Sequence, residues 1–305
     1  MLSWLFSVAT FAGIYALLAL GINVIWGMGG MINLGMAGFF ALGAYASALA
    51  TAAGGLPIAL GLVLASGLAA LAGGMLCRLT LKLRGDYLAI VTLGFSELVR
   101  LIAANEIWLT NGSDGISGVP GPWRAELSPF QFNMLNCGLV AIAVVLVWAL
   151  TERLRRAPWG RALRAIRDDD VAAAVAGKPV RRFKVQAFAL GAAILGLAGA
   201  FYAHYTSYIA PDIFRPLITI YIFLALTAGG TGNTTGAVIG AIAVVTVLEG
   251  SRFLEAWVSV LGGVQKAALR EIVIGVALIA IMQLRPLGLL PETPPGPFMR
   301  KKREL

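Results

Sequence analysis

Charge is scarce in this 305-residue chain: 13% of its residues are Asp, Glu, Lys or Arg, and 59% are hydrophobic. Soluble globular domains carry about 25% charged residues, so the composition excludes an ordinary soluble domain. The apolar residues form continuous runs and do not alternate with polar ones, which disfavours a transmembrane β-barrel. The composition therefore predicts an all-α protein, a polytopic bundle of transmembrane helices.

Cysteine and histidine, common ligands of metal sites, are nearly absent. The only cysteines, Cys77 and Cys137, fall at or inside apolar runs, so we expect reduced thiols without a disulfide framework. The only histidine is His204, and without neighbouring cysteines or clustered carboxylates it favours a hydrogen-bonded interfacial residue over a metal ligand. No Ser/His/Asp or Cys/His arrangement is present. The sequence thus predicts no catalytic residues, no metal site and no enzyme activity.

A nucleotide-binding loop is also missing. Gly177 and Lys178 are followed by Pro179, and no glycine lies five residues before Gly177, so the Walker A spacing is not met. If ATP powers this protein, another chain must bind it, and we expect no cofactor on this one. The net charge of +9 comes from a few basic loops and the tail 300–303. That distribution is typical of membrane orientation signals and anionic-lipid contacts, and not of nucleic-acid binding.

Nine apolar runs approach the roughly 20 residues that a helix needs to cross a bilayer, although the second, seventh and ninth are the weakest. With the N-terminus outside and the C-terminus inside, nine crossings place three basic segments on one side, which the positive-inside rule makes the cytoplasm. These segments are 78–84, 151–184 and the tail 285–305, all within a single transmembrane domain, 1–305. We expect the first run to be a retained span and not a signal peptide. The runs are 5–26, 34–53, 56–76, 87–104, 132–150, 185–202, 217–228, 237–253 and 272–284.

The interval 151–184 is the longest stretch dense in charge, and apolar runs flank it on both sides. Leu163 and Ile166 lie three residues apart, which is a helical spacing. The three aspartates at 168–170 can cap a second short helix, and Gly177 can end it. We predict two short cytoplasmic helices joined by an acidic turn. Their role stays open between an ordinary connector and a docking element for a cytosolic partner.

Glycine interrupts the apolar runs in two places, 26–35 and 228–236. Interrupted spans in transporters often mark the transport pathway, because glycine lets the backbone leave the helix or approach a neighbour closely. The alternative is a tight cytoplasmic turn between antiparallel helices, which we slightly favour at the second place. Gly236 and Gly240 are four residues apart, a spacing that predicts close helix packing. The candidate pathway residues are Asn23, Asn33, Phe95, Gly230 and Gly232.

Two acid–base pairs occur inside apolar runs at a spacing of three residues: Glu97 with Arg100, and Glu249 with Arg252. Residues at this spacing share a helix face, so each acid can neutralise its own base. Charges inside a membrane are costly and therefore candidates for function. Both pairs lie near the outer ends of the predicted spans, so we favour structural ion pairs with snorkelling arginines. No unpaired acid stands clearly at mid-depth, where a proton relay would need one.

Several motifs in this order resemble one known family of membrane proteins. GDYLAIVTLGFSELVRL begins at Gly85, LTNGSDGI at Leu109 and GRALRAIRDDDVAAAVAGKPVRRFKVQAF at Gly160. They are preceded by GINVIWGMGGMINLGMAGFFALGAY and followed by LGLAGAFYAHYTSYIAPD, AGGTGNTTGAVIGA and RPLGLL. They lie between residues 21 and 290, and the resemblance extends over nearly the whole chain. They resemble the LivM family, the permease subunits of branched-chain amino acid ABC importers.

The resemblance implies a bacterial inner-membrane machine built from several chains. A LivM-type permease pairs with a LivH-like permease, two ATPase subunits that bind ATP, and a periplasmic substrate-binding protein. Its cytoplasmic loop 160–178 would sit in a groove of one ATPase, and closure of the ATPases would switch the pathway between outward and inward access. The substrates would be branched-chain or other small amino acids, amides or urea. The residues expected to couple to the ATPase are Gly160, Arg161, Arg164, Asp168, Asp169, Asp170, Gly177 and Lys178.

The residues leave one other transport mechanism to weigh. An ion-gradient-driven secondary transporter of small polar metabolites would need a titratable or cation-binding centre at mid-depth. The scarcity of such residues counts against it. An intramembrane enzyme would need a nucleophile with its base, or metal ligands, and the sequence supplies neither.

Overall fold

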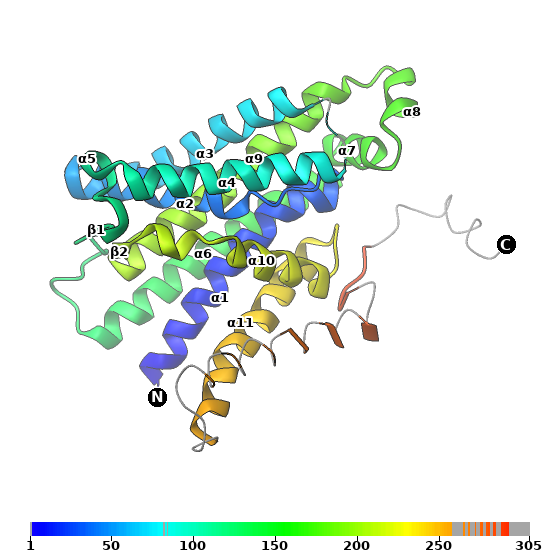
Figure 1. Cartoon of the computed structure of the whole chain (residues 1–305). Coiled ribbons are helices and arrows are strands. Elements are labelled where there is room, and N and C mark those ends of the chain that lie inside the picture. The colour runs from blue at the N-terminus through cyan, green and yellow to red at the C-terminus, as the bar shows by residue number, and fades with distance from the viewer. Residues whose placement is uncertain are drawn as a thin grey trace.

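The computed structural model describes residues 2–81, 83, 85–257 and 288–292, together with isolated positions between 265 and 284. Within these residues the chain is almost entirely α-helical, and long helices run back and forth between the two ends of a bundle (Figure 1). One end carries α7 (Pro158–Asp168) and α8 (Asp170–Val175). The opposite end carries two short strands, β1 (Ile116–Ser117) and β2 (Tyr208–Ile209).

Six helices of the described part are long and apolar enough to cross a membrane, and they match the first six predicted spans to within a few residues. The seventh run is α10 (Pro216–Gly229), which has only 14 residues, and the eighth lies in α11 (Thr234–Trp257). The ninth run, 272–284, is described only at isolated positions, so the count of nine is not confirmed. The six helices are α1 (Leu2–Ile22) with its π-helical turn η1 (Asn23–Met28), α2 (Met36–Ala48) with η2 (Leu49–Ala53), α3 (Ile58–Thr80), α4 (Asp86–Asn105), α6 (Pro129–Arg156) and α9 (Val180–Thr206).

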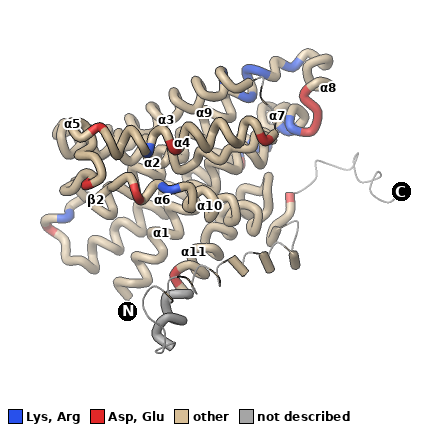
Figure 2. Tube along the Cα trace, viewed as in Figure 1, with Lys and Arg blue, Asp and Glu red and all other residues tan. Residues whose placement is uncertain are grey.

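Two of the basic segments that were predicted to share one side of the membrane lie together in the described part of the fold. Arg78, at the end of α3, lines the same shallow groove as Arg181 and Arg182 at the start of α9. Two of the three basic segments therefore lie at one end of the bundle, where Figure 2 shows most of the charge. The basic tail, 285–305, falls outside the described residues except for 288–292.

The end opposite α7 and α8 is built from turns, as the Gly- and Pro-rich composition of 105–131 predicts. β1 (Ile116–Ser117) pairs antiparallel with β2 (Tyr208–Ile209), which ties the loop before α6 to the segment after α9. Ser128 then caps α6 with a complete capping box to Gln131. The remaining short helices of this end are α5 (Ile107–Thr110), η3 (Gly112–Asp114) and η4 (Pro211–Phe214).

Helix α9 lies at the centre of the core, packed against α1, α2 and α3. Small residues allow its backbone to approach its neighbours. A Cβ atom on Gly43 of α2 would lie 2.1 Å from the carbonyl oxygen of Gly196 in α9, and one on Gly199 would lie 2.1 Å from that of Phe40. Such backbone contact gives the dispersion packing that holds membrane helices together, since lipid supplies no hydrophobic drive between them.

Helices α10 and α11 form a second glycine-mediated contact. A Cβ on Gly240 would lie 2.0 Å from the carbonyl oxygen of Ala225, and one on Gly229 would clash with the carbonyl oxygen of Gly236. This confirms the close packing that the spacing of Gly236 and Gly240 predicts. The four residues between the two helices form a tight turn, which is the arrangement we favoured for the second glycine break.

His204 is buried and hydrogen-bonded at both ring nitrogens, as predicted. Its Nε2 lies 2.7 Å from Ser47 Oγ in α2, and its Nδ1 lies 2.7 Å from the carbonyl oxygen of Pro120. These contacts fasten the end of α9 to α2 and to the loop before α6. Cys77 and Cys137 are both free thiols.

A candidate coupling site at the basic end

Helix α7 forms because its apolar residues repeat on one face. Pro158 starts it, a position that suits proline because the first helical N–H groups have no partner. Leu163 and Ile166 are buried, at 0% and 2% exposure, and hold α7 against the bundle. Gly160 allows the close approach, since a Cβ there would lie 2.3 Å from the carbonyl oxygen of Leu154. The helical spacing predicted for this stretch is confirmed.

Helix α8 begins at the predicted acidic turn. Asp169 has extended backbone between the two helices, and its Oδ1 accepts hydrogen bonds from the N–H groups of Val171 at 3.0 Å and Ala172 at 2.9 Å. The cap is worth about 1 kcal/mol. Gly177 follows with a φ of +76°, which glycine adopts at little cost, and it ends the helical segment.

The other predicted coupling residues divide between the bundle and the surface. Asp170 is tied to Lys184 of α9 at 3.0 Å, and Asp168 is tied to Arg167 at 3.2 Å. Arg161 and Lys178 are exposed, like most of α8. The helix pair therefore anchors its inner face and presents its outer face to solvent.

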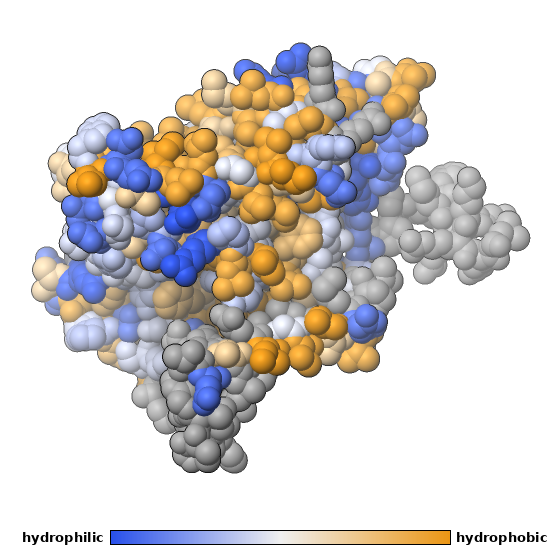
Figure 3. Space-filling model, viewed as in Figure 1, coloured by the Kyte–Doolittle hydropathy of each residue, from blue (hydrophilic) through white to orange (hydrophobic). Residues whose placement is uncertain are grey.

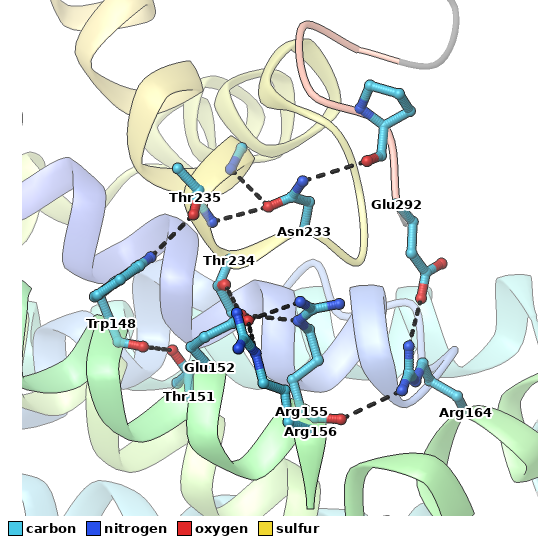
Figure 4. A network of polar contacts seen from close by, with 12 residues as sticks. Trp148, Thr151, Glu152, Arg155, Arg156, Arg164, Asn233, Thr234, Thr235 and Glu292 are labelled. Carbon is cyan, nitrogen blue, oxygen red and sulfur yellow. Dashed lines mark hydrogen bonds and ion pairs between the residues drawn. The ribbon is translucent and has the colours of Figure 1, made fainter. Parts of the chain in front are cut away.

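The end of α6 is joined to the start of α11 through Glu152, whose side chain is only 12% exposed (Figure 4). Its carboxylate accepts hydrogen bonds from Arg155, at 2.7 and 2.8 Å, and from Arg156 at 2.6 Å. It also accepts the hydroxyl of Thr234 at the beginning of α11. The sequence analysis did not single out Glu152, although an acid followed by arginines at i+3 and i+4 is a recognisable helical pattern.

A second network joins α7 to the rest of the basic end. Arg167 Nη1 donates to Glu292 Oε2 at 2.9 Å and to the carbonyl oxygen of Gly27 in η1. Arg164 Nη1 lies 3.6 Å from the other carboxylate oxygen of Glu292, a contact drawn in Figure 4, and its Nη2 donates to the carbonyl oxygen of Arg155. Neither Arg167 nor Glu292 was predicted, and no local pattern marks Glu292, which is 125 residues from Arg167.

The two glycine breaks, predicted separately, meet beside this network. Asn23 Oδ1 accepts the backbone N–H of Gly232 at 2.9 Å, and Asn23 is fully buried. Gly27 is required here, since a Cβ would lie 2.1 Å from Asn23 Oδ1. Gly232 and Gly230 take φ values of +81° and +115°. Three of the predicted pathway residues therefore come together at the basic end, next to α7.

The other two predicted pathway residues lie elsewhere. Asn33 is buried, and its Oδ1 accepts the N–H of Gly35 at 2.8 Å, at the start of α2. Phe95 packs against Phe39, with ring centroids 4.8 Å apart. Phe95 is thus part of the contact between α2 and α4, and its environment is that of a packing residue.

The first predicted ion pair is present, but it lies deeper than expected. Arg100 Nε is 3.0 Å from both carboxylate oxygens of Glu97. Glu97 stands eight residues before Asn105, the end of α4, or about 12 Å at 1.5 Å per residue. Glu97 is therefore near the middle of the helix, whereas Arg100, five residues before Asn105, lies closer to its outer end. Glu249 lies in α11, but the side chain of Arg252 falls outside the described residues, so the second pair stays a prediction.

Comparison with known proteins places these features in a family. The sequence family described as branched-chain amino acid transport system / permease component matches residues 4–282. The chain belongs to this permease family. The permease is 35% identical to the high-affinity branched-chain amino acid transport system permease protein LivM of Escherichia coli (strain K12), over 94% of this chain and 70% of LivM.

More distant relatives of this permease include a second kind of subunit. This chain is 30% identical to a probable LivM of Methanocaldococcus jannaschii, over 80% of this chain and 71% of that protein. It is 27% identical to the permease protein LivH of Escherichia coli (strain K12), over 79% of this chain and 82% of LivH. No solved structure matches it. The family and the apolar helices together make this chain a multi-pass membrane transport subunit.

Proposed function

We propose that this permease is the LivM-like subunit of an ATP-binding cassette importer in a bacterial inner membrane. It pairs with a LivH-like permease, and two ATPase subunits and a periplasmic substrate-binding protein complete the assembly. The substrates are branched-chain or other small amino acids, or related amides or urea. ATP is bound by the ATPases, and this chain carries no cofactor and no catalytic site of its own. The relatives named LivM and LivH support the pairing of two homologous permeases.

The observation that carries the proposal is the surface of α8. Val175 is 86% exposed and Val171 is 60% exposed, at the charged end of the bundle. A valine gains about 1.5–3 kcal/mol when it is fully buried, so two of them on a water-facing helix favour a protein contact. This supports a docking element over an ordinary connector, the two roles that the sequence left open. We propose that α8 docks into a groove on one of the two ATPase subunits.

The contacts of α7 suggest how movement of the docked element reaches the transport pathway. Arg167 binds the Gly27 carbonyl in η1 and the carboxylate of Glu292. Gly27 in turn abuts the contact between Asn23 and Gly232. A displacement of α7 by the ATPase therefore acts on both glycine breaks. We propose that these breaks form the cytoplasmic gate, and that the described helices with the run 272–284 give the nine crossings.

A cross-linking experiment tests the docking assignment. Val175→Cys is made in a chain whose Cys77 and Cys137 are replaced by alanine, and it is assembled with its cognate subunits. A short bifunctional thiol reagent should join Val175→Cys to an ATPase subunit, whereas the matched variant Tyr208→Cys, at the opposite end, should not react with it. Equal cross-linking of both variants, or of neither, would contradict the assignment.

Transport itself is measured in vesicles that contain the whole complex. Uptake of leucine should require ATP inside the vesicle, in complexes oriented with α8 facing the vesicle interior. Uptake should continue when the proton and sodium gradients are abolished. Uptake that ignores ATP and stops with an ionophore would instead indicate an ion-gradient-driven transporter.

A further inference from the structure

The outer third of the crossing that contains α10 is not helical. The 14 residues of α10 span about 21 Å, whereas the hydrocarbon core of a bilayer is about 30 Å thick. Between the end of α9 at Thr206 and the start of α10 at Pro216, the chain forms only the short strand β2 and the 3-10 turn η4. The outer part of this crossing therefore consists of irregular backbone.

Contacts with α2 and α4 place this irregular segment at membrane depth. Phe214 is buried against Phe40 of α2, with ring centroids 5.2 Å apart. Arg215 stands 14 residues before Gly229, the inner end of α10, and Arg100 stands 14 residues after Asp86, the inner end of α4. At 1.5 Å per residue both arginines lie about 21 Å from the inner ends of their helices, at the same level.

Two ion pairs meet on this face at that level. Asp212 and Arg215 are 2.8 Å apart, and their side chains are 71% and 63% exposed. Glu97 and Arg100 form the second pair, on helix α4, which contacts η4, and the Glu97 side chain is 39% exposed. Figure 3 shows hydrophilic surface in the middle of this face, with hydrophobic surface around it.

Lipid is a poor cover for such a surface. Open irregular backbone does not occur against hydrocarbon, because its polar groups would be unsatisfied there; it occurs where protein covers it or where it lines a water-filled cavity. Ionised side chains at membrane depth likewise face water or protein. Both features lie on the same face, formed by α4, η4 and the start of α10.

We propose that this face is one wall of a water-filled route that opens to the outer side, and that the paired homologous permease closes the route from across. The identity of the partner rests on the proposed function. Leu98 of α4, next to Glu97 and 55% exposed, suits contact with a partner helix. The charges of both signs suit a net-neutral zwitterion, which carries one charged group of each sign.

Thiol labelling of the intact complex tests the wall. Leu101→Cys is compared with Leu64→Cys on α3, which is 48% exposed and lies about 24 Å from the inner end of its helix, against about 22 Å for Leu101. Both variants are made with Cys77 and Cys137 replaced by alanine. A membrane-impermeant thiol reagent added outside should modify Leu101→Cys at least about tenfold faster, because a thiol in hydrocarbon stays neutral and only the thiolate reacts. Equal labelling rates for the two variants would show that this face does not line a water-filled route and would overturn the proposal.

The partner is tested by a bifunctional thiol reagent on Leu98→Cys, in complexes whose partner permease carries introduced cysteines. A cross-linked product that contains the partner permease supports the proposal, and a product that contains only two copies of this chain overturns it. The labelling does not depend on ATP. Fast labelling of Leu101→Cys together with ATP-independent uptake would therefore support a water-filled route along this face but reject the proposed ATP-driven function.

Discussion

Replacing Glu292 with glutamine removes a carboxylate that pairs with both Arg164 and Arg167 of α7. The substitution keeps the shape of the side chain and removes its charge. Arg167 retains its bond to the carbonyl oxygen of Gly27, and α7 retains its buried Leu163. We therefore expect Glu292→Gln to leave the fold intact and to loosen α7 selectively.

The magnitude follows from the geometry of the pair. A hydrogen bond to a charged group contributes about 1.5–3 kcal/mol when it is well formed. Arg167 and Glu292 are 25% and 22% exposed, so solvent screens part of this interaction, and we expect a loss of about 1–2 kcal/mol. That loss shifts the equilibrium between docked and released α7 by about 5- to 30-fold.

Hydrogen exchange measures this shift directly in the reconstituted complex. Amide exchange in residues 158–168 should accelerate by about the same 5- to 30-fold if these amides exchange through release of α7. The amount of substrate transported for each ATP hydrolysed should fall, because movement of α7 is no longer carried fully to the gate. Glu126→Gln, an exposed acid in the loop before α6, is the matched control and should change neither quantity.

Two results would refute this reasoning. Unchanged exchange in residues 158–168 would show that Glu292 does not hold α7. Faster exchange with an unchanged ratio of transport to hydrolysis would show that α7 is held by Glu292 but does not drive the gate through it.

Three other predictions address packing, capping and coupling. Gly43→Ala should destabilise the folded protein by about 1–3 kcal/mol, because the new Cβ would lie 2.1 Å from the Gly196 carbonyl oxygen. Gly67→Ala is the control and should be tolerated, because a Cβ there meets no atom within 4 Å. Equal thermal stability of the two variants would contradict the packing between α2 and α9. Asp169→Ala should cost α8 about 1 kcal/mol and speed amide exchange at 171 and 172 only; exchange identical to wild type would show that the cap is dispensable. Arg164→Glu should uncouple ATP hydrolysis from transport without loss of insertion, and normal coupled uptake would argue against a coupling role.

The helices could be predicted from the sequence because the bilayer imposes a single length and a single polarity on them. The acidic turn was predictable for a similar reason, since Asp169 makes its cap with residues two and three positions away. These are local interactions, and local interactions leave a mark in the order of residues. The boundaries of 151–184 as a charged interval were likewise visible in composition alone.

The networks at the basic end could not be predicted, because their partners are far apart in the chain. Arg167 binds Gly27 and Glu292, which are separated from it by 140 and 125 residues. The depth of Glu97 was misjudged for a different reason. The predicted run 87–104 and helix α4 end within one residue of each other, so the span itself was right, but the roughly 12 Å of helix that follow Glu97 were not counted when the acid was placed near the outer end.

The glycine contact between α10 and α11 has a mechanical consequence. Two helices whose backbones touch over Gly229, Gly236 and Gly240 cannot slide or twist independently, so they respond to a push as one rigid arm. If this arm pivots close to Gly232, its outer end at Arg215 lies about 21 Å from the inner end of α10 at Gly229. A tilt of about 10° at the cytoplasmic pivot would carry that tip about 4 Å sideways, a distance comparable to the width of a small solute.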